Sequence, residues 1–210
     1  MKMDVDLSQF CEAPFTYNEL ASQLENYAAP KNKVQYMERQ GKIVRLKKGM
    51  YVNAHGNASF YSSTGLIANH LYGPSYVSLH TALRYYGLIP EHVYTTTSVT
   101  MGRSREIINK VGRFTYTHVA PDYYPIGITR QKEDDLCFLM ATPEKALCDL
   151  IVCTKKLRLR SLSSLLVYLE EDMRIDMELF AEMNPGIFEA CAQVSKKSQT
   201  LLNLAKLLRR

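Results

Sequence analysis

Apolar and polar residues near the N-terminus repeat with helical spacing. Thr16 is followed three residues later by Glu19, the capping-box pattern that opens a helix. The apolar positions that follow predict a first helix ending near residues 27–29. A second helix is expected over residues 31–40, because its apolar positions again share one face and Gly41 is a good C-terminal residue. The sequence therefore predicts two consecutive short helices.

The next stretch changes to an extended pattern. Residues 43–52 predict two short strands joined by a turn at Gly49, with Lys47 and Lys48 at the tip. Residues 53–59 are polar and rich in turn formers, so we expect a short linker there. A helix pair followed by a basic hairpin is typical of a winged helix-turn-helix. We therefore predict such a domain over residues 1–57 and a second domain over residues 58–210.

The second domain is predicted to mix helices and strands. Helical spacing, β-branched runs and capping patterns predict helices over residues 60–71 and 79–86, strands over 93–101, 113–119 and 135–140, a helix opening at 142–144, and three or four helices over 161–208. This order of elements predicts an α+β fold, in which a larger helical domain carries a small β-sheet.

The net charge of the chain is +5, and its distribution is uneven. Residues 31–48 hold seven basic residues and one acidic residue, a net charge of +6, so the rest of the chain sums to about −1. A basic charge confined to the second helix and the hairpin is the pattern of a nucleic-acid-binding surface. A solvated basic surface with no DNA role is the alternative.

The polar side chains of this segment suit double-stranded DNA. Asn and Gln pair with adenine edges in the major groove, and Lys and Arg bind guanine or phosphate. A basic hairpin beside such a helix would contact phosphates or the minor groove. The candidate DNA-binding residues are Lys31, Asn32, Lys33, Gln35, Tyr36, Arg39, Arg45, Lys47 and Lys48.

Composition and cysteine spacing restrict the remaining classes. No apolar run approaches the ~18 residues that span a bilayer, and the N-terminus lacks the apolar core of a signal peptide, so we expect a cytoplasmic protein without a membrane partner. The five cysteines are irregularly spaced and include no C-x-x-C pair, which indicates neither a disulfide framework nor a zinc site. Cys148 and Cys153 are expected to be buried as small hydrophobic residues.

We find no convincing catalytic constellation, and we expect neither enzymatic activity nor a cofactor or metal. Phosphate-binding, dinucleotide-binding, zinc-protease and hydrolase motifs are missing from the sequence. Glu144 and Asp149 could belong to a nuclease, but an acid in the first turn of a helix is explained by the helix dipole. In the turn at residues 102–105, Arg103 and Arg105 are a possible phosphate or partner contact, with a solvated turn as the alternative.

Four segments together resemble a known family. They are KKGMYV at 47–52, YVSLHTALRYYGLIP at 76–90, VYTTTSVT at 93–100 and TPEKALCDL at 142–150. The chain resembles the AbiEi-type antitoxins of bacterial abortive-infection (type IV) toxin–antitoxin systems over residues ~14–155. The second and fourth segments are fairly specific as a pair, whereas the winged-helix segment alone is not.

The resemblance implies two activities. The winged helix would repress the protein's own operon by binding inverted repeats in promoter DNA. The second domain would oppose a nucleotidyltransferase-like toxin, without requiring a stable complex. A ligand-responsive transcriptional regulator without a toxin partner is the alternative.

Overall fold

The computed structural model describes residues 7, 10, 13–25, 27–54, 64–133, 135–159 and 161–209. The α-helices are α1 (Tyr17–Ser22), α2 (Pro30–Arg39), α3 (Thr64–Leu71), α4 (Leu79–Tyr85), α5 (Pro143–Cys153), α6 (Leu162–Val167), α7 (Met177–Ala181), α8 (Pro185–Val194) and α9 (Ser198–Leu208), with a π-helical turn η3 (Tyr168–Asp172). The strands are β1 (Phe15–Thr16), β2 (Ile43–Lys47), β3 (Met50–Asn53), β4 (Ser75–Val77), β5 (Thr95–Thr100), β6 (Arg105–Ile108), β7 (Arg113–His118), β8 (Ile128–Glu133) and β9 (Leu136–Ala141). The predicted mixed α+β class is confirmed.

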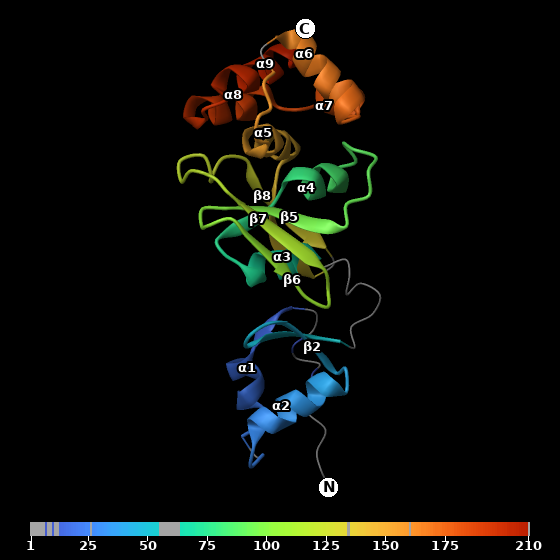
Figure 1. Cartoon of the computed structure of the whole chain (residues 1–210), viewed down its shortest axis with the longest axis vertical. Helices are drawn as coiled ribbons and strands as arrows, with labels where there is room; N and C mark the ends of the chain where they lie inside the picture. Colours follow the sequence, from blue (N-terminus) through green and yellow to red (C-terminus); the bar gives the residue numbers. More distant parts are fainter. Residues whose placement is uncertain are drawn as a thin grey trace.

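The elements are arranged in three levels along the longest axis of the molecule (Figure 1). Helices α1 and α2 lie at one end, with β2 between them and the rest of the chain. The larger sheet occupies the middle. Helix α5 lies between that sheet and the C-terminal helices, which form the opposite end (Figure 1).

The first helix is held by the predicted capping box. The Thr16 backbone N–H donates to Glu19 Oε2 at 2.5 Å, and the Glu19 N–H donates to Thr16 Oγ1 at 3.3 Å. The helix ends at Ser22, so the predicted end near residues 27–29 is wrong. The Ser22 hydroxyl donates to the Glu19 carbonyl at 2.7 Å and so satisfies a helix carbonyl locally, as serine side chains do at helix ends.

The second helix and the hairpin follow the predicted pattern closely. Pro30 occupies the first turn of α2, and Gly41 follows the helix with a φ of +67°, where glycine is favoured. Strands β2 and β3 pair antiparallel around Gly49, and β1, which the sequence did not predict, pairs with β3 on its other side. Their apolar side chains form a separate small core: Leu7, Phe15, Leu20, Leu24, Val34, Met37, Ile43 and Tyr51.

The predicted linker and the boundary at residues 57/58 fall mostly outside the described residues, which resume at Thr64. Helix α3 matches the later part of the helix predicted over residues 60–71, and residues 60–63 are not described. The division into two domains therefore stays a prediction.

The second sheet has six strands in the order β6-β7-β5-β4-β9-β8, larger than the small three-stranded sheet predicted. Strands β5 and β7 are parallel, as are β4 and β9, and the other pairs are antiparallel. The three predicted strands are present as β5, β7 and β9. Strand β4 has only three residues, and β6 and β8 are edge strands rich in charged residues, so none of these three carries a clear apolar period.

Helices cover this sheet and extend its core. Helix α3 packs closely on β9 because Gly65 faces the Phe138 ring, and the Tyr116 hydroxyl on β7 donates to the Ala68 carbonyl at 2.7 Å. The predicted start of α5 is confirmed: Thr142 Oγ1 accepts from the Lys145 N–H, and Pro143 lies in the first turn. Helix α8 packs on α5, and α9 packs on α8, so the C-terminal helices are joined to the sheet through α5.

Candidate nucleic-acid interface

The outer face of α2 holds most of the predicted DNA-binding side chains. Val34 and Met37 are buried on its inner face at 2% and 1% exposure, so residues one and two positions away are directed outward. Within the described part of the chain, the exposed cationic and amide side chains of this face that take part in no hydrogen bond or ion pair are Lys31, Asn32, Gln35 and Arg39. Their donors and acceptors are therefore available to a partner.

Two tyrosine rings flank the remaining lysine of this helix. The Lys33 ammonium lies 5.0 Å from the centroid of the Tyr27 ring and 5.6 Å from that of Tyr36. Such cation–π contacts hold the charge in place without neutralising it. Tyr36 itself is 53% exposed, so an aromatic surface accompanies the cations on this face.

Arg45 joins the β2–β3 hairpin to α2. Its Nη2 atom lies 2.7 Å from Glu38 Oε2, and its guanidinium lies 5.7 Å from the centroid of the Tyr51 ring. Glu38 is the single acid of the basic segment, and this ion pair directs it toward β2. Arg45 thus orients α2 against the sheet and carries less free positive charge than its neighbours.

The tip of the hairpin contacts α3, the first helix of the part of the molecule from residue 64 onward, which is called the C-terminal part below. Lys47 Nζ donates to the carbonyl oxygens of Leu71, at 2.6 Å, and His70, at 3.3 Å, which end α3. A cation at these carbonyls is favoured by the helix dipole. Partial burial lowers the pKa of Lys47, and the positive charge of Arg105 lowers it further. Lys48, one residue on, is exposed.

Two further contacts fix the hairpin in this position. Asn109 Nδ2 donates to the Leu46 carbonyl at 3.1 Å, from the loop that joins β6 to β7. Leu46 and Val52, at 3% and 0% exposure, belong to the larger hydrophobic core and not to the small N-terminal one. The sequence suggested a free wing and gave no sign of this docking, since Lys47 has the same residue type as a phosphate contact.

The turn at residues 102–105 places its two arginines on the surface. Arg103 is in the turn, whereas Arg105 is already the first residue of β6. Both side chains are exposed, and the Arg105 guanidinium lies 5.0 Å from the centroid of the Tyr72 ring. Met101, Gly102, Arg103, Ser104 and His118 line an open hollow of about 410 Å³.

The two acids considered for a nuclease serve separate structural contacts. Glu144 Oε1 accepts from the backbone N–H of Asn184 at 2.9 Å, at the start of α8. Asp149 is fully buried on α5, where its carboxylate accepts from Ser78 Oγ at 2.6 Å and lies 3.3 Å from Lys145 Nζ. Within the described residues, no group of three His, Cys, Asp or Glu side chains could hold a metal ion.

Lys145 and Asp149 form a buried ion pair that the sequence did not reveal. Both side chains are 0% exposed, and Lys145 Nζ also donates to the Tyr123 carbonyl at 2.9 Å and lies 3.2 Å from the centroid of the Tyr123 ring. Burial raises the pKa of Asp149, while the charge of Lys145 and the hydrogen bond from Ser78 lower it. The pair has no access to solvent, and its hydrogen bonds link α5 to Ser78, which follows β4, and to Tyr123, which lies in the loop after β7.

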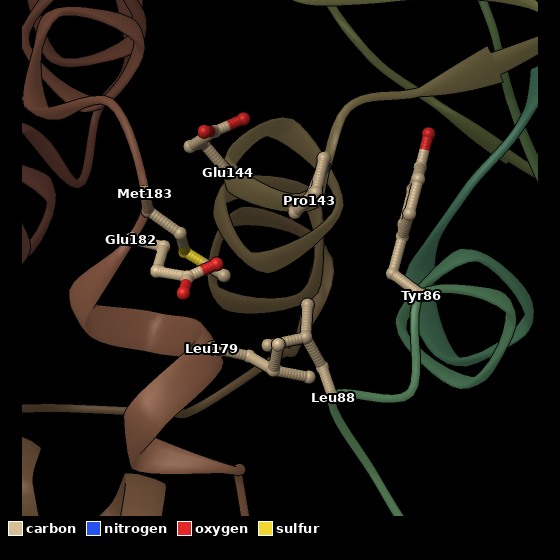
Figure 2. Close-up of a pocket in the computed structure, with 7 residues that line it drawn as sticks. All are labelled: Tyr86, Leu88, Pro143, Glu144, Leu179, Glu182 and Met183. Atoms are coloured by element: carbon tan, nitrogen blue, oxygen red, sulfur yellow. The ribbon is translucent and has the colours of Figure 1, made fainter.

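A second hollow, of about 250 Å³, lies where α4, α5 and α7 meet (Figure 2). Pro143, Leu88, Leu179 and Met183 give it an apolar lining, and Tyr86 stands on the side formed by the end of α4 (Figure 2). The Tyr86 hydroxyl donates to the Ala141 carbonyl at 3.0 Å, and burial raises its pKa to about 12. Glu144 and Glu182 complete the lining.

The cysteines agree in part with their predicted role. Cys148 is buried, as expected, and Cys153 is only half-buried. The four described cysteines are all free thiols.

Comparison with known proteins assigns this chain to no family. No protein-family model matches the sequence, and no curated protein matches it. No helix of the described ranges combines the length and the apolar composition needed to cross a membrane.

Proposed function

We propose that residues 1–57 form a winged helix-turn-helix that binds double-stranded DNA, with α2 as the recognition helix. Helices α1 and α2 share a small core with the three-stranded sheet, and the β2–β3 hairpin follows α2 directly. This order of elements is the one that winged helix-turn-helix domains use.

One observation carries the proposal: the outer face of α2 presents unpaired cations and amides together. Lys31, Gln35 and Arg39 are spaced by four residues, so they form one stripe along the helix, and Asn32 lies beside it. Amide side chains read adenine edges, and Lys and Arg bind guanine or phosphate.

The hairpin contributes through Lys48 more than through Lys47. Lys48 is exposed at the tip, whereas the Lys47 ammonium is engaged with the carbonyls that end α3. We therefore assign the wing contact with phosphate to Lys48 and the docking of the wing to Lys47.

We further propose that the protein is the autorepressor and antitoxin of a type IV toxin–antitoxin operon. The support is the resemblance of residues ~14–155 to AbiEi-type antitoxins, together with the DNA-binding face of α2. The C-terminal part would oppose a nucleotidyltransferase-like toxin. It would do so without catalysis, because its buried Lys145–Asp149 pair and Glu144 are engaged in contacts between elements.

The hollow between α4, α5 and α7 gives little support to the alternative of a ligand-responsive regulator. The hollow between α4, α5 and α7 has a volume of about 250 Å³, and pockets for small molecules usually have about 300–1,000 Å³. A ligand of ordinary metabolite size would require this hollow to widen.

The test uses the full chain and the DNA upstream of its own gene. We expect Lys31→Gln with Arg39→Gln to weaken binding and to reduce the slope of log K against log salt by about 1.8, since each lost phosphate contact removes about 0.9. Arg130→Gln with Lys132→Gln, exposed positions on β8, is the control with equal loss of charge. An unchanged affinity in the α2 variant would reject α2 as the recognition helix.

A second arm tests the antitoxin activity. The chain is co-expressed with the nucleotidyltransferase-like gene adjacent to its own. Restored growth in the presence of the full chain supports the proposal. Killing that the full chain does not relieve rejects it.

A further inference from the structure

The hollow beside the turn at residues 102–105 lies at the end of the larger sheet where the parallel strands β5 and β7 finish. Strands β5 and β7 are parallel neighbours, with Thr100 opposite His118 at their carboxyl ends. Residues 101–104 follow β5, so this turn and His118 meet at the same edge. Ligands of open sheets with parallel strands are generally bound outside the carboxyl ends of those strands.

Hydrogen bonds hold the turn in one shape. His118 Nδ1 lies 3.1 Å from the Met101 carbonyl and 2.9 Å from the Gly102 carbonyl; carbonyls only accept, so Nδ1 carries the hydrogen. Thr100 Oγ1 accepts from the Gly102 N–H at 3.0 Å, and Ser104 Oγ accepts from the His118 N–H at 3.0 Å. The turn is therefore fixed before any ligand arrives.

Gly102 lies close to the Tyr72 side chain in this arrangement. A Cβ atom at this position would lie 2.6 Å from the Tyr72 hydroxyl oxygen, too close for any other residue without movement. The same Tyr72 ring supports the Arg105 guanidinium at 5.0 Å. Tyr72 thus lies against Gly102, which lines the hollow, and also supports Arg105, which is not itself a lining residue.

The charges at this edge are not compensated by the described residues. Arg103 and Arg105 have no ion pair there, and Glu106, the adjacent acid in the chain, is paired with Arg113 at 2.9 Å. Lys47 is near enough to Arg105 for the two charges to repel each other. An anion bound beside Arg105 would reduce this repulsion.

We propose that this hollow binds a phosphate ester. The Arg103 guanidinium in the lining, with the Arg105 guanidinium two residues further along the chain, supplies the forked donors that suit phosphate oxygens. The Ser104 hydroxyl accepts from His118 and retains its own hydrogen to donate. The phosphate belongs either to a DNA backbone or to a free nucleotide. The site lies in the C-terminal part, so it does not depend on DNA binding by α2.

The experiment compares two probes with the full chain: ATP, by isothermal titration calorimetry, and a 20-base-pair duplex of arbitrary sequence, by fluorescence anisotropy. The variant is Arg103→Gln with Arg105→Gln. Arg103→Gln alone is the second variant, since the Arg103 side chain makes no hydrogen bond, ion pair or ring contact among the described residues, and its loss leaves the contact of Arg105 with Tyr72 intact. Arg130→Gln with Lys132→Gln on β8, at the opposite edge of the sheet, removes the same charge as a control.

Each outcome decides the proposal. ATP binding that the double variant weakens at least tenfold, with the control unchanged, identifies a free nucleotide as the ligand. No ATP binding, but a tenfold loss of duplex affinity with a salt slope reduced by about 1–2, identifies a DNA phosphate. Equal behaviour of the double variant and the control with both probes overturns the proposal.

The α2 variant distinguishes the proposed phosphate site from the proposed DNA-binding face of α2. Lys31→Gln with Arg39→Gln should leave ATP binding unchanged. If that variant binds the duplex as the unmodified chain does while the Arg103 and Arg105 variant does not, the function proposed for α2 fails and the phosphate site stands.

Discussion

The ammonium of Lys47 lies 2.6 Å from the carbonyl oxygen of Leu71, the last residue of α3. This bond fastens the tip of the basic hairpin to the C-terminal part of the molecule. The next residue, Lys48, is exposed at the same tip. Two adjacent lysines therefore differ in role, one holding the hairpin and the other available to a partner.

Lys47→Met should lower stability more than Lys48→Met. Loss of a charged donor from the end of α3 is expected to cost about 1–2 kcal/mol of unfolding free energy, whereas an exposed lysine should cost little. Urea denaturation of the two variants checks the difference. Lys48→Met should in turn reduce the salt dependence of DNA binding by one phosphate contact, a slope change of about 0.9. Equal stability of the two variants would contradict the assignment.

Lys145→Met should be strongly destabilising, by about 3–5 kcal/mol, because it leaves the Asp149 carboxylate buried without its cation. The double variant Lys145→Met with Asp149→Leu should recover much of that loss, since replacing both partners removes the uncompensated charge. Midpoints of guanidinium unfolding measure both. A double variant no more stable than Lys145→Met would show that the ion pair is not the cause.

Gly65→Ala should destabilise the fold by about 1–2 kcal/mol, although alanine favours helices. The new Cβ would overlap the buried Phe138 ring, and overpacking of this kind outweighs the propensity gain of about 1 kcal/mol. Gly112→Ala is the matched control, because nothing lies within 4 Å of a Cβ there. The expected result is a lower melting temperature for the first variant only.

Glu19 should make stability depend on pH at acidic values. The hydrogen bond from the Thr16 backbone N–H lowers the pKa of Glu19 below 4.5, and the charge of His70 adds to this. A carboxyl group with a lowered folded-state pKa stabilises above its unfolded pKa and loses that contribution as pH falls through the folded value. The stability difference between the unmodified chain and Glu19→Gln, below about 1 kcal/mol at this exposed cap, should shrink between pH 7 and pH 3. A constant difference in thermal unfolding would contradict it.

The sequence predicted those elements whose signals are local. Thr16 and Thr142 cap their helices as expected, and Gly49 has the positive φ of +77° that its turn requires. Strand β4 could not be predicted in this way, because its three residues are fixed by pairing with β5 and β9 and not by their own pattern. The polar edge strand β8 was missed for the same reason.

The candidate site was predicted less completely than the fold. The exposure of Lys31 and Arg39 follows from helical spacing, which the sequence contains. The docking of Lys47 depends on where α3 ends in space, and the burial of Lys145 depends on Tyr123 lying against it from a loop 22 residues away. Tertiary contacts of charged side chains leave no periodic signal.

The central position of β4 has a consequence for the order of folding. The small N-terminal core is closed by residues that all precede β4 in the chain, so it can form while the rest is still being synthesised. Strand β4 instead pairs with β9 through Val77 and Met140, and its other neighbour, β5, comes earlier in the chain than β9. The two halves of the sheet join only once β9 has left the ribosome. Contacts of such high sequence separation slow folding, so we expect the N-terminal part to acquire its structure first and the sheet to complete it last.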